Sequence, residues 1–229
     1  MRRGLGYNEG MSTSVTAVQF IDSLESLRTP AGIRMGSIFA LAKENIDMSL
    51  TEVKKLLASP AHEARVGAVS IMDFQARSKK TSSERKKELF DLYIERHDLI
   101  NTWDLVDRSA IYVVGGYLSD KPRDILYKLA RSKDMNQRRT AAVATFYFIM
   151  KQDDVEDAFK IAELLVNEKE TLTQKAAGWV LREAGKHDPK KLLSFLDKHA
   201  KSMPRPLLRN AIERLPKDQK AHYLALGLS

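Results

Sequence analysis

The stretch NTWDLVDR, residues 101–108, holds a tryptophan and a carboxylate four residues apart, Trp103 and Asp107. In a helix these two side chains share one face, one above the other. A tryptophan face attracts cations, and a carboxylate stabilises positive charge that develops beside it. The pair could therefore hold a positively charged ring and stabilise a cationic transition state.

A purely structural interpretation of the same stretch is open as well. Asn101 or Thr102 would cap the helix, Asp104 would favour the positive end of its dipole, and Trp103 would pack in the core. Spacing alone favours this structural interpretation. Capping explains Asp104 better than Asp107, however, because Asp107 already lies one turn into the helix.

The second tryptophan, Trp179, lies in AAGWVLRE. A buried core aromatic is a common role for tryptophan at helical spacing. On neighbouring helices, however, Trp103, Trp179, Asp107 and Arg139 would form an aromatic-walled site that bears a carboxylate. The pair Arg138-Arg139 is a weak signal alone, since basic pairs usually lie on solvated surfaces.

Helical periodicity dominates the elements that must position these residues. Apolar residues recur at helical spacing, as in Ala17, Phe20, Ile21, Leu24 and Leu27. Alternating β-branched runs are missing, and helix breakers fall at Pro30, Pro60, Pro122, Pro189 and Pro216. The sequence therefore predicts an all-α chain of about a dozen helices.

Three helical segments also resemble one another: EARVGAVSIMDF (63–74), QRRTAAVATFYF (137–148) and TQKAAGWVLREA (173–184). The last two begin 36 residues apart and the first two 74 apart, so a further copy belongs near residue 100. This period predicts a right-handed HEAT-like α-α solenoid, with residues 13–229 as one domain. The third positions, Arg65, Arg139 and Lys175, would then lie along one concave face.

The charge balance favours a polyanionic partner. The chain has 38 basic and 30 acidic residues, a net charge of +8, and residues 181–229 hold 11 basic against 5 acidic ones. We therefore expect a basic concave face built largely from the C-terminal third. The run SKKTSSERKK (78–87) is expected to be an exposed loop that leads into a helix and could touch phosphates.

Several other chemistries are excluded or unsupported. The chain has no cysteine, which excludes disulfides and thiolate sites. Its histidines lack metal-ligand spacing, and nucleotide-binding glycine loops are missing, so neither a metal nor a cofactor is expected. No apolar run approaches the roughly 20 residues that span a bilayer, which suggests a cytoplasmic protein without membrane contact. Residues 1–12 are expected to be poorly ordered, with Met11 as an alternative start.

Four segments together resemble the AlkD-type DNA alkylation repair enzymes, a family of HEAT-like repeat DNA glycosylases. They are SPAHEARVGAV (59–69), HDLINTWDLVDRSA (97–110), QRRTAAVATF (137–146) and QKAAGWVLRE (174–183). These segments keep the family's order and approximate spacing over roughly residues 30–215. The strings W-D-x-V-D and G-W-V-L-R-E are fairly specific in combination.

The resemblance implies roles for single residues. Asp107 matches the family's catalytic aspartate, Trp103 and Trp179 match the tryptophans that line its site, and Arg139 matches the arginine that holds the DNA backbone beside the lesion. Arg182 matches a position associated with backbone contact. Arg138, Arg65 and Lys175 complete the set of expected DNA-binding residues.

The resemblance also implies a reaction: hydrolysis of the N-glycosidic bond of 3- and 7-alkylated purines in double-stranded DNA, by a monomer, without base flipping. Two positions depart from the family pattern. Asn136 stands where family members usually carry a tryptophan, and Gly36 stands at the proline of the family's G-V-R-x-P motif. Two other functions stay open, a DNA-structure or lesion binder without turnover and a protein-binding scaffold.

Overall fold

The computed structural model describes residues 15–226 and is all-α, as the sequence predicts. The N-terminal residues 1–12, Met11 among them, lie outside the described part of the chain. Within residues 15–226 no β-strand forms, and Thr29 and Gly32 make only an isolated bridge. No helix in this part of the chain is long and apolar enough to cross a membrane.

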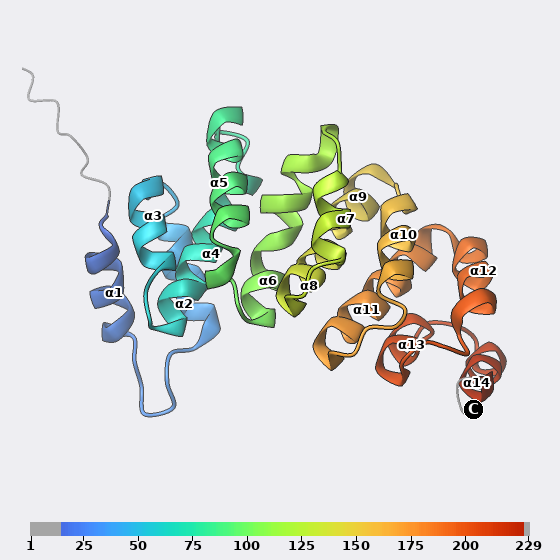
Figure 1. The fold of residues 1–229 in the computed structure, drawn as a ribbon. Helices are drawn as coiled ribbons and strands as arrows, with labels where there is room; N and C mark the ends of the chain where they lie inside the picture. The colour runs from blue at the N-terminus through green and yellow to red at the C-terminus, as the bar shows by residue number, and fades with distance from the viewer. Residues whose placement is uncertain (1–14, 227–229) are drawn as a thin grey trace, which may run out of the picture.

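The helices stack in two rows along the molecule (Figure 1). One row runs through α4 (His62–Arg77), α6 (Trp103–Ser109), α8 (Met135–Ala144), α11 (Thr171–His187) and α13 (Arg205–Ala211), each packed on the next. The other elements are α1 (Ala17–Ser26), α2 (Met35–Glu44), α3 (Leu50–Leu57), α5 (Ser83–Glu95), α7 (Asp124–Ala130), α9 (Phe146–Gln152), α10 (Glu156–Leu164), α12 (Pro189–His199) and α14 (Lys217–Leu226). Such stacking is solenoid-like; the handedness and a basic concave face stay predictions.

Local sequence sets where these helices begin. Thr16 closes a capping box with Gln19 at the start of α1, and Ser82 accepts from the Arg85 amide at the start of α5. The Asp134 carboxylate accepts two amides at the start of α8. These side chains satisfy amides that have no partner within the helix. The predicted breakers are confirmed, since each of the five prolines lies between helices or in the first turn of one.

The row of α4, α6, α8 and α11 corresponds to the similar segments in the sequence, including the copy expected near residue 100. The small residues in these segments, such as Ala141, Ala142, Ala176 and Ala177, are fully buried where the helices meet. Small side chains let helix axes approach closely. The sequence similarity therefore reflects equivalent places in the stack.

The segment 137–148 is not one helix, contrary to its helical pattern. α8 ends at Ala144 and α9 begins at Phe146, with Thr145 between them. The Thr145 hydroxyl donates to the carbonyl of Ala142 at 2.7 Å and so competes with the helix ladder. The same region also receives a close helix contact, because an added Cβ at Gly115 would lie 2.2 Å from the Ala144 carbonyl oxygen.

The helix of NTWDLVDR continues beyond α6 in an unexpected form. Residues Ala110–Gly115 form a π-helical segment, η2, followed by a 3₁₀ turn, η3 (Tyr117–Asp120). π-helical turns inside α-helices frequently occur at functional sites. α6 and η2 follow one another directly, so they form one continuous helical stretch that begins at Trp103 and ends at Gly115.

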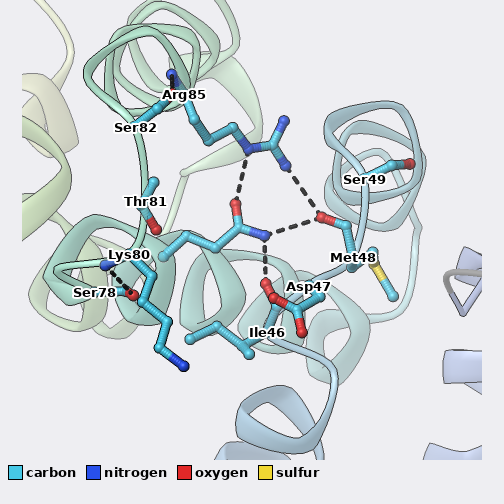
Figure 2. Close-up of a pocket in the computed structure, with 10 residues that line it drawn as sticks. Ile46, Asp47, Met48, Ser49, Ser78, Lys80, Thr81, Ser82 and Arg85 are labelled. Carbon is cyan, nitrogen blue, oxygen red and sulfur yellow. Dashed lines mark hydrogen bonds between the residues drawn. The ribbon is translucent and has the colours of Figure 1, made fainter. Parts of the chain in front are cut away.

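A cavity of about 610 Å³ lies beside the loop between α4 and α5 (Figure 2). Arg85 donates to the Gln75 side chain at 3.1 Å and to the Met48 carbonyl at 3.1 Å, and Gln75 donates to the carbonyls of Ile46 and Met48. These bonds tie the α2–α3 loop to the start of α5. The cavity therefore lies beside hydrogen bonds that stabilise the fold. Neither Asp107 nor a tryptophan lines it.

Candidate functional site

The helix α6 presents one face to solvent and buries the other. Leu105 and Val106 are fully buried, whereas Trp103 is 49% exposed and Asp107 is half-buried. The interpretation in which Trp103 packs in the core is therefore wrong. Thr102 occupies the N-cap position but makes no capping bond through its side chain.

Asp104 makes a contact between helices that its capping role did not predict. Its Oδ2 lies 2.8 Å from Nε2 of His62, the first residue of α4. Burial acts to raise the pKa of Asp104, but its polar contacts with Thr102 and His62 outweigh it, so the pKa lies below its usual value. This contact fixes the N-terminal end of α6, and with it Trp103, against α4.

Asp107 is held by Arg139 in a two-pronged ion pair. Nε of Arg139 donates to Oδ1 at 2.9 Å and Nη2 donates to Oδ2 at 2.7 Å. The side chain of Arg139 is only 6% exposed, against 23% for Asp107. Bidentate arginine–carboxylate pairs fix orientation as well as charge. The carboxylate is thus set in one orientation while its outer edge stays open to solvent.

Arg139 also joins α6 to a third helix. Its Nη1 donates to the carbonyl of Leu172 at the start of α11. Three of the five guanidinium N–H groups are therefore used inside the protein. The arginine predicted to face DNA is almost buried, and its contacts connect α6, α8 and α11.

Trp179 lies on α11 and is partly buried. Its ring lies 4.2 Å from that of Phe146, centroid to centroid, at an interplanar angle of 45°. Among the described residues no ring contact joins Trp179 to Trp103, and α8 lies between their helices. The two tryptophans therefore stand on either side of the helix that carries Arg139.

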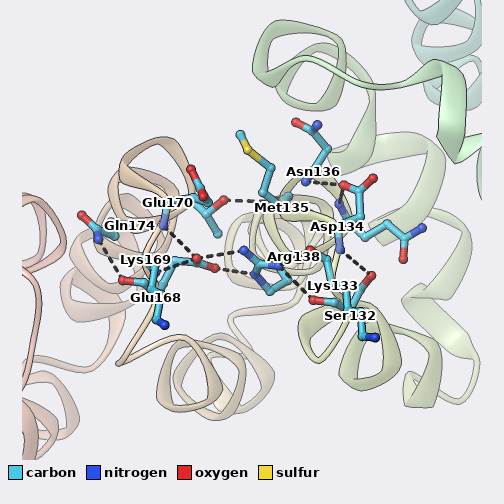
Figure 3. Close-up of polar contacts among 12 residues, drawn as sticks. Ser132, Lys133, Asp134, Met135, Asn136, Arg138, Glu168, Lys169, Glu170 and Gln174 are labelled. Atoms are coloured by element: carbon cyan, nitrogen blue, oxygen red, sulfur yellow. Dashed lines mark hydrogen bonds and ion pairs between the residues drawn. The ribbon is translucent and has the colours of Figure 1, made fainter.

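Arg138 makes a clamp within the protein (Figure 3). Its guanidinium donates to both oxygens of Glu168, at 2.5 and 2.9 Å, and to the carbonyls of Ser132 and Lys133. The Glu168 carboxylate also accepts the amides of Lys169 and Glu170. The clamp ties the start of α8 to the loop before α11, so it supports the spacing that the Arg139 contacts require.

The other expected DNA-binding residues fall into two groups. Arg182 is bound to Glu213 and lies near Glu183, so its charge is largely matched. Arg65 and Lys175 have no ion-pair partner among the described residues, and Nε of Arg65 is buried without a hydrogen bond. Arg65 lies on α4 and Lys175 on α11, one on each side of the α6–α8 pair. These two cations are free to meet a phosphate.

A buried polar cluster surrounds Thr140, the residue that follows Arg139, and no sequence motif indicates it. The Thr140 hydroxyl lies 2.9 Å from Nε2 of His97 and 3.0 Å from the Tyr93 hydroxyl. Burial lowers the pKa of His97 and raises that of Tyr93, so both groups are held neutral. The only sequence signal for this cluster is a polar residue, Thr140, in a helical segment that is otherwise rich in alanine. The cluster fixes the rotation of α8 that directs Arg139 toward α6.

A second buried cluster holds the opposite side of α6. Arg108 donates to Asp73 at 2.7 Å and to Ser70 at 2.9 Å, and its guanidinium lies over the rings of Phe39 and Phe74. Burial raises the pKa of Asp73 even though Arg108 acts to lower it. Because Arg108 follows Asp107 directly, this anchoring also limits how far the Asp107 carboxylate can move.

The donor set offers little to a metal ion. Among residues 15–226, no three His, Asp or Glu side chains converge as metal ligands would. The Asp107 carboxylate already faces a guanidinium, which is an unfavourable neighbour for a cation ligand. The Asp107 carboxylate is instead a partly exposed anion on the same helix face as the exposed Trp103.

Comparison with known proteins identifies relatives of this arrangement. A family model described as DNA alkylation repair enzyme matches residues 12–215. Among solved structures, one described as "Predicted DNA alkylation repair enzyme from Enterococcus faecalis" superposes with a TM-score of 0.61 at 17% identity, over 88% of this chain and 95% of that chain. At this identity the likeness shows a shared fold. No curated protein matches the chain.

Proposed function

The chain belongs to the family of DNA alkylation repair enzymes, and on that premise we propose that it is a DNA glycosylase. Its substrates are purines alkylated at the 3- or 7-position in double-stranded DNA. The observation that carries the proposal is the oriented Asp107 carboxylate on an open surface beside Trp103.

The proposed reaction needs little from the protein besides charge. Alkylation at these ring nitrogens makes the purine cationic, so the base is already a good leaving group. As the C1′–N bond breaks, its electron pair moves to the base and neutralises it, while positive charge develops on the sugar. Water adds to C1′ and loses a proton, which leaves a free alkylpurine and an abasic sugar. Asp107 stabilises the sugar cation and orients the water.

The interaction energies of the two groups with a positive charge indicate that Asp107 contributes more to catalysis than the tryptophans. A carboxylate about 4 Å from a unit positive charge contributes about 4 kcal/mol at an effective dielectric constant of 20. A tryptophan–cation contact contributes about 0.5–2 kcal/mol. Each 1.4 kcal/mol is about tenfold in rate, so loss of Asp107 should cost about 1000-fold. Trp103 and Trp179 then serve mainly to hold the cationic nucleotide.

Arg139 has two roles in this proposal. Its fork to Asp107 orients the carboxylate, and its two remaining N–H groups are directed to the phosphate beside the lesion. Arg65 and Lys175, which are unpaired, neutralise phosphates on either side in a salt-sensitive, sequence-independent way. Arg138 and Arg182 support the helices through their bonds to Glu168 and Glu213 and come near DNA only at the margin.

An open site favours reaction without base flipping. Trp103 is half exposed and Asp107 lies beside it on the helix surface. Enzymes that flip a base enclose it in a pocket, whereas a carboxylate at an exposed helix surface reaches the sugar from the backbone side. Bulky alkyl groups would then be tolerated, because no pocket wall limits their size.

A second function has one observation in its favour. Both Asp107 oxygens are already bonded to Arg139, which partly neutralises the carboxylate. A DNA-lesion binder without turnover would keep a carboxylate whose two oxygens are both bonded to an arginine. This binder differs from the glycosylase in one measurable property, the release of free base.

The test is release of 7-methylguanine and 3-methyladenine from methylated duplex DNA, by wild type and by Asp107→Asn. We expect release by the wild type and a loss of about 1000-fold in the variant, with DNA binding retained. Binding without release by the wild type would replace the glycosylase with the lesion binder. Neither release nor binding at low salt would leave the protein-binding scaffold.

A further inference from the structure

A basic groove lies at the far end of the helix that carries Trp103 and Asp107. Two adjoining cavities, of about 340 and 440 Å³, share the residues Lys86, Gly116, Tyr117 and Tyr147. Their walls come from the end of α4, the loop that follows it, the start of α5, η2, η3 and α9. We call these two cavities the distal groove.

The distal groove carries cations that no carboxylate neutralises. Lys79, Lys86 and Lys151 have no ion-pair partner among the described residues, and the 340 Å³ cavity has no carboxylate in its lining. Two acidic residues, Glu84 and Asp120, line the 440 Å³ cavity, and Asp120 is paired with Lys121. Free ammonium groups gathered along one groove attract polyanions.

Three tyrosines add neutral donors to the same groove. The hydroxyls of Tyr112, Tyr117 and Tyr147 have no hydrogen-bond partner in the described part of the chain, although all three residues line it. Two ring contacts fix all three, since Tyr117 stacks on Phe90 at 4.4 Å and Tyr112 meets Tyr147 edge-on at 5.7 Å. A rigid wall of hydroxyl donors beside free ammonium groups suits oxyanions.

We propose that the distal groove is a second nucleic-acid site, which binds the phosphates of a single strand. The lysines neutralise successive phosphates and the tyrosine hydroxyls donate to their oxygens. Positive grooves lined by aromatic residues are how proteins follow single strands without reading sequence. The run SKKTSSERKK, which contributes Lys79 and Lys86, thereby gains a role.

The continuity of the two cavities favours a strand over a free nucleotide. A free nucleotide carries its charge at one point and would fill one cavity. Lys79 lines only the 340 Å³ cavity and Lys86 lines both, so the charge extends along the groove. A duplex about 20 Å wide would lie across the opening and meet few of the tyrosines, whereas a single strand can enter.

The distal groove is separate from the Asp107 site. From Trp103 to Gly116 the α6–η2 helix rises by roughly 20 Å. The distal groove therefore does not belong to the surface that faces the damaged base. Its occupant is a single-stranded segment, distinct from the duplex held at the Asp107 site.

Fluorescence anisotropy with a labelled eight-nucleotide thymidine strand tests the proposal. The variant carries Lys79→Gln, Lys86→Gln and Lys151→Gln. Its control carries Lys54→Gln, Lys160→Gln and Lys190→Gln, which remove the same charge from α3, α10 and α12. We expect at least tenfold weaker binding in the groove variant and less than threefold in the control. The slope of log affinity against log salt should fall by about 2, or 0.7 per lost contact.

A second variant separates the groove from charge alone. Replacing Tyr112, Tyr117 and Tyr147 by phenylalanine keeps net charge and rings, and should weaken strand binding about three- to tenfold. Circular dichroism melts check that each variant folds. Equal loss in the groove and control lysine variants, or no loss in either groove variant, would overturn the proposal. Competition by thymidine monophosphate or inorganic phosphate as strong as that by the unlabelled strand would assign the groove to small phosphates instead.

Discussion

The two ends of the α6–η2 helix treat positive charge in opposite ways. At the Trp103 end, Arg139 is bound to Asp107 and Arg138 to Glu168, and both arginines are almost or largely buried. At the Gly116 end, Lys79, Lys86 and Lys151 line open cavities without carboxylate partners. The first region uses the cations next to Asp107 to set geometry and keeps free cations only on the flanking helices, whereas the second leaves its three lysines free for an outside anion.

The cations of a basic chain therefore fall into two classes, paired and unpaired. A net charge of +8 predicts an anionic partner but does not say which cations meet it. Paired arginines contribute to position, because each fork fixes one helix against another. Unpaired lysines contribute to affinity, because each one that neutralises a phosphate releases counterions condensed on the nucleic acid. Substitutions of the paired arginines should therefore lower stability and base release, whereas substitutions of the unpaired lysines should lower affinity for nucleic acid.

Among substitutions of the paired and unpaired cations, the largest effect is expected from Arg139→Ala. The substitution leaves Asp107 without a partner and removes the bond to Leu172, so we expect a loss of about 2–3 kcal/mol in unfolding free energy. This is less than for a fully buried pair, because Asp107 is partly exposed. Base release should fall about 100-fold, as the carboxylate loses its orientation. Urea unfolding and single-turnover release measure the two losses.

Arg139→Lys sharpens that result, since it keeps the charge and loses the fork. We expect unfolding free energy to recover to within about 1 kcal/mol of the wild type while release stays at least tenfold reduced. Full recovery of release by the lysine variant would show that charge, and not orientation, is what Arg139 supplies.

The helix between the two regions gives the next effect. In Gly115→Ala the new Cβ would lie 2.2 Å from the Ala144 carbonyl oxygen, so α8 must shift. We expect a loss of about 1–3 kcal/mol and slower base release, because Arg139 lies on the helix that moves. Gly36→Ala is the matched control: nothing lies within 4 Å of the new Cβ. This change should be neutral or stabilise by up to about 1 kcal/mol.

The fold could be predicted from the sequence because its signals are local. Apolar spacing, capping residues and the 36-residue similarity all lie within single helices or between neighbouring ones. That Trp103 and Asp107 share one helix face followed from i, i+4 spacing, but the exposure of Trp103 did not, because spacing alone favoured a core position. The Arg139–Asp107 pair did not, since it joins residues 32 apart and depends on how α6 and α8 are rotated against each other. The tyrosine and lysine wall of the distal groove comes from four elements, so no single motif carries it.

The two tryptophans should separate binding from folding at the Trp103 end. Trp103→Ala removes a half-exposed ring, so unfolding free energy should change by less than about 1 kcal/mol. Base release should fall about three- to thirtyfold, the loss of one cation–π contact. Trp179→Ala also removes packing against Phe146, and should cost about 2 kcal/mol of stability. Equal stability losses in the two variants would contradict the difference in exposure.

The smallest effect concerns acid stability of the Arg138 clamp. Burial acts to raise the pKa of Glu168, but bonds from Arg138 and from the amides of Lys169 and Glu170 outweigh it, so the pKa lies below its usual value. A carboxyl whose pKa is depressed on folding stabilises the protein above its unfolded pKa, about 4.3, and loses that contribution as pH falls through the folded value.

Glu168→Gln should therefore lower unfolding free energy by about 1–2 kcal/mol at neutral pH, and the gap to wild type should close as the pH falls below about 4. Urea melts at a series of pH values measure the gap, with Glu170→Gln as the control, since its exposed carboxylate makes no hydrogen bond in the described part of the chain. A gap that persists at pH 3 would mean that shape, and not charge, holds the clamp. The lysines of the distal groove have no such carboxylate partner. Their replacement should therefore leave the loss of unfolding free energy at low pH unchanged, so the pH dependence of stability distinguishes paired from unpaired cations.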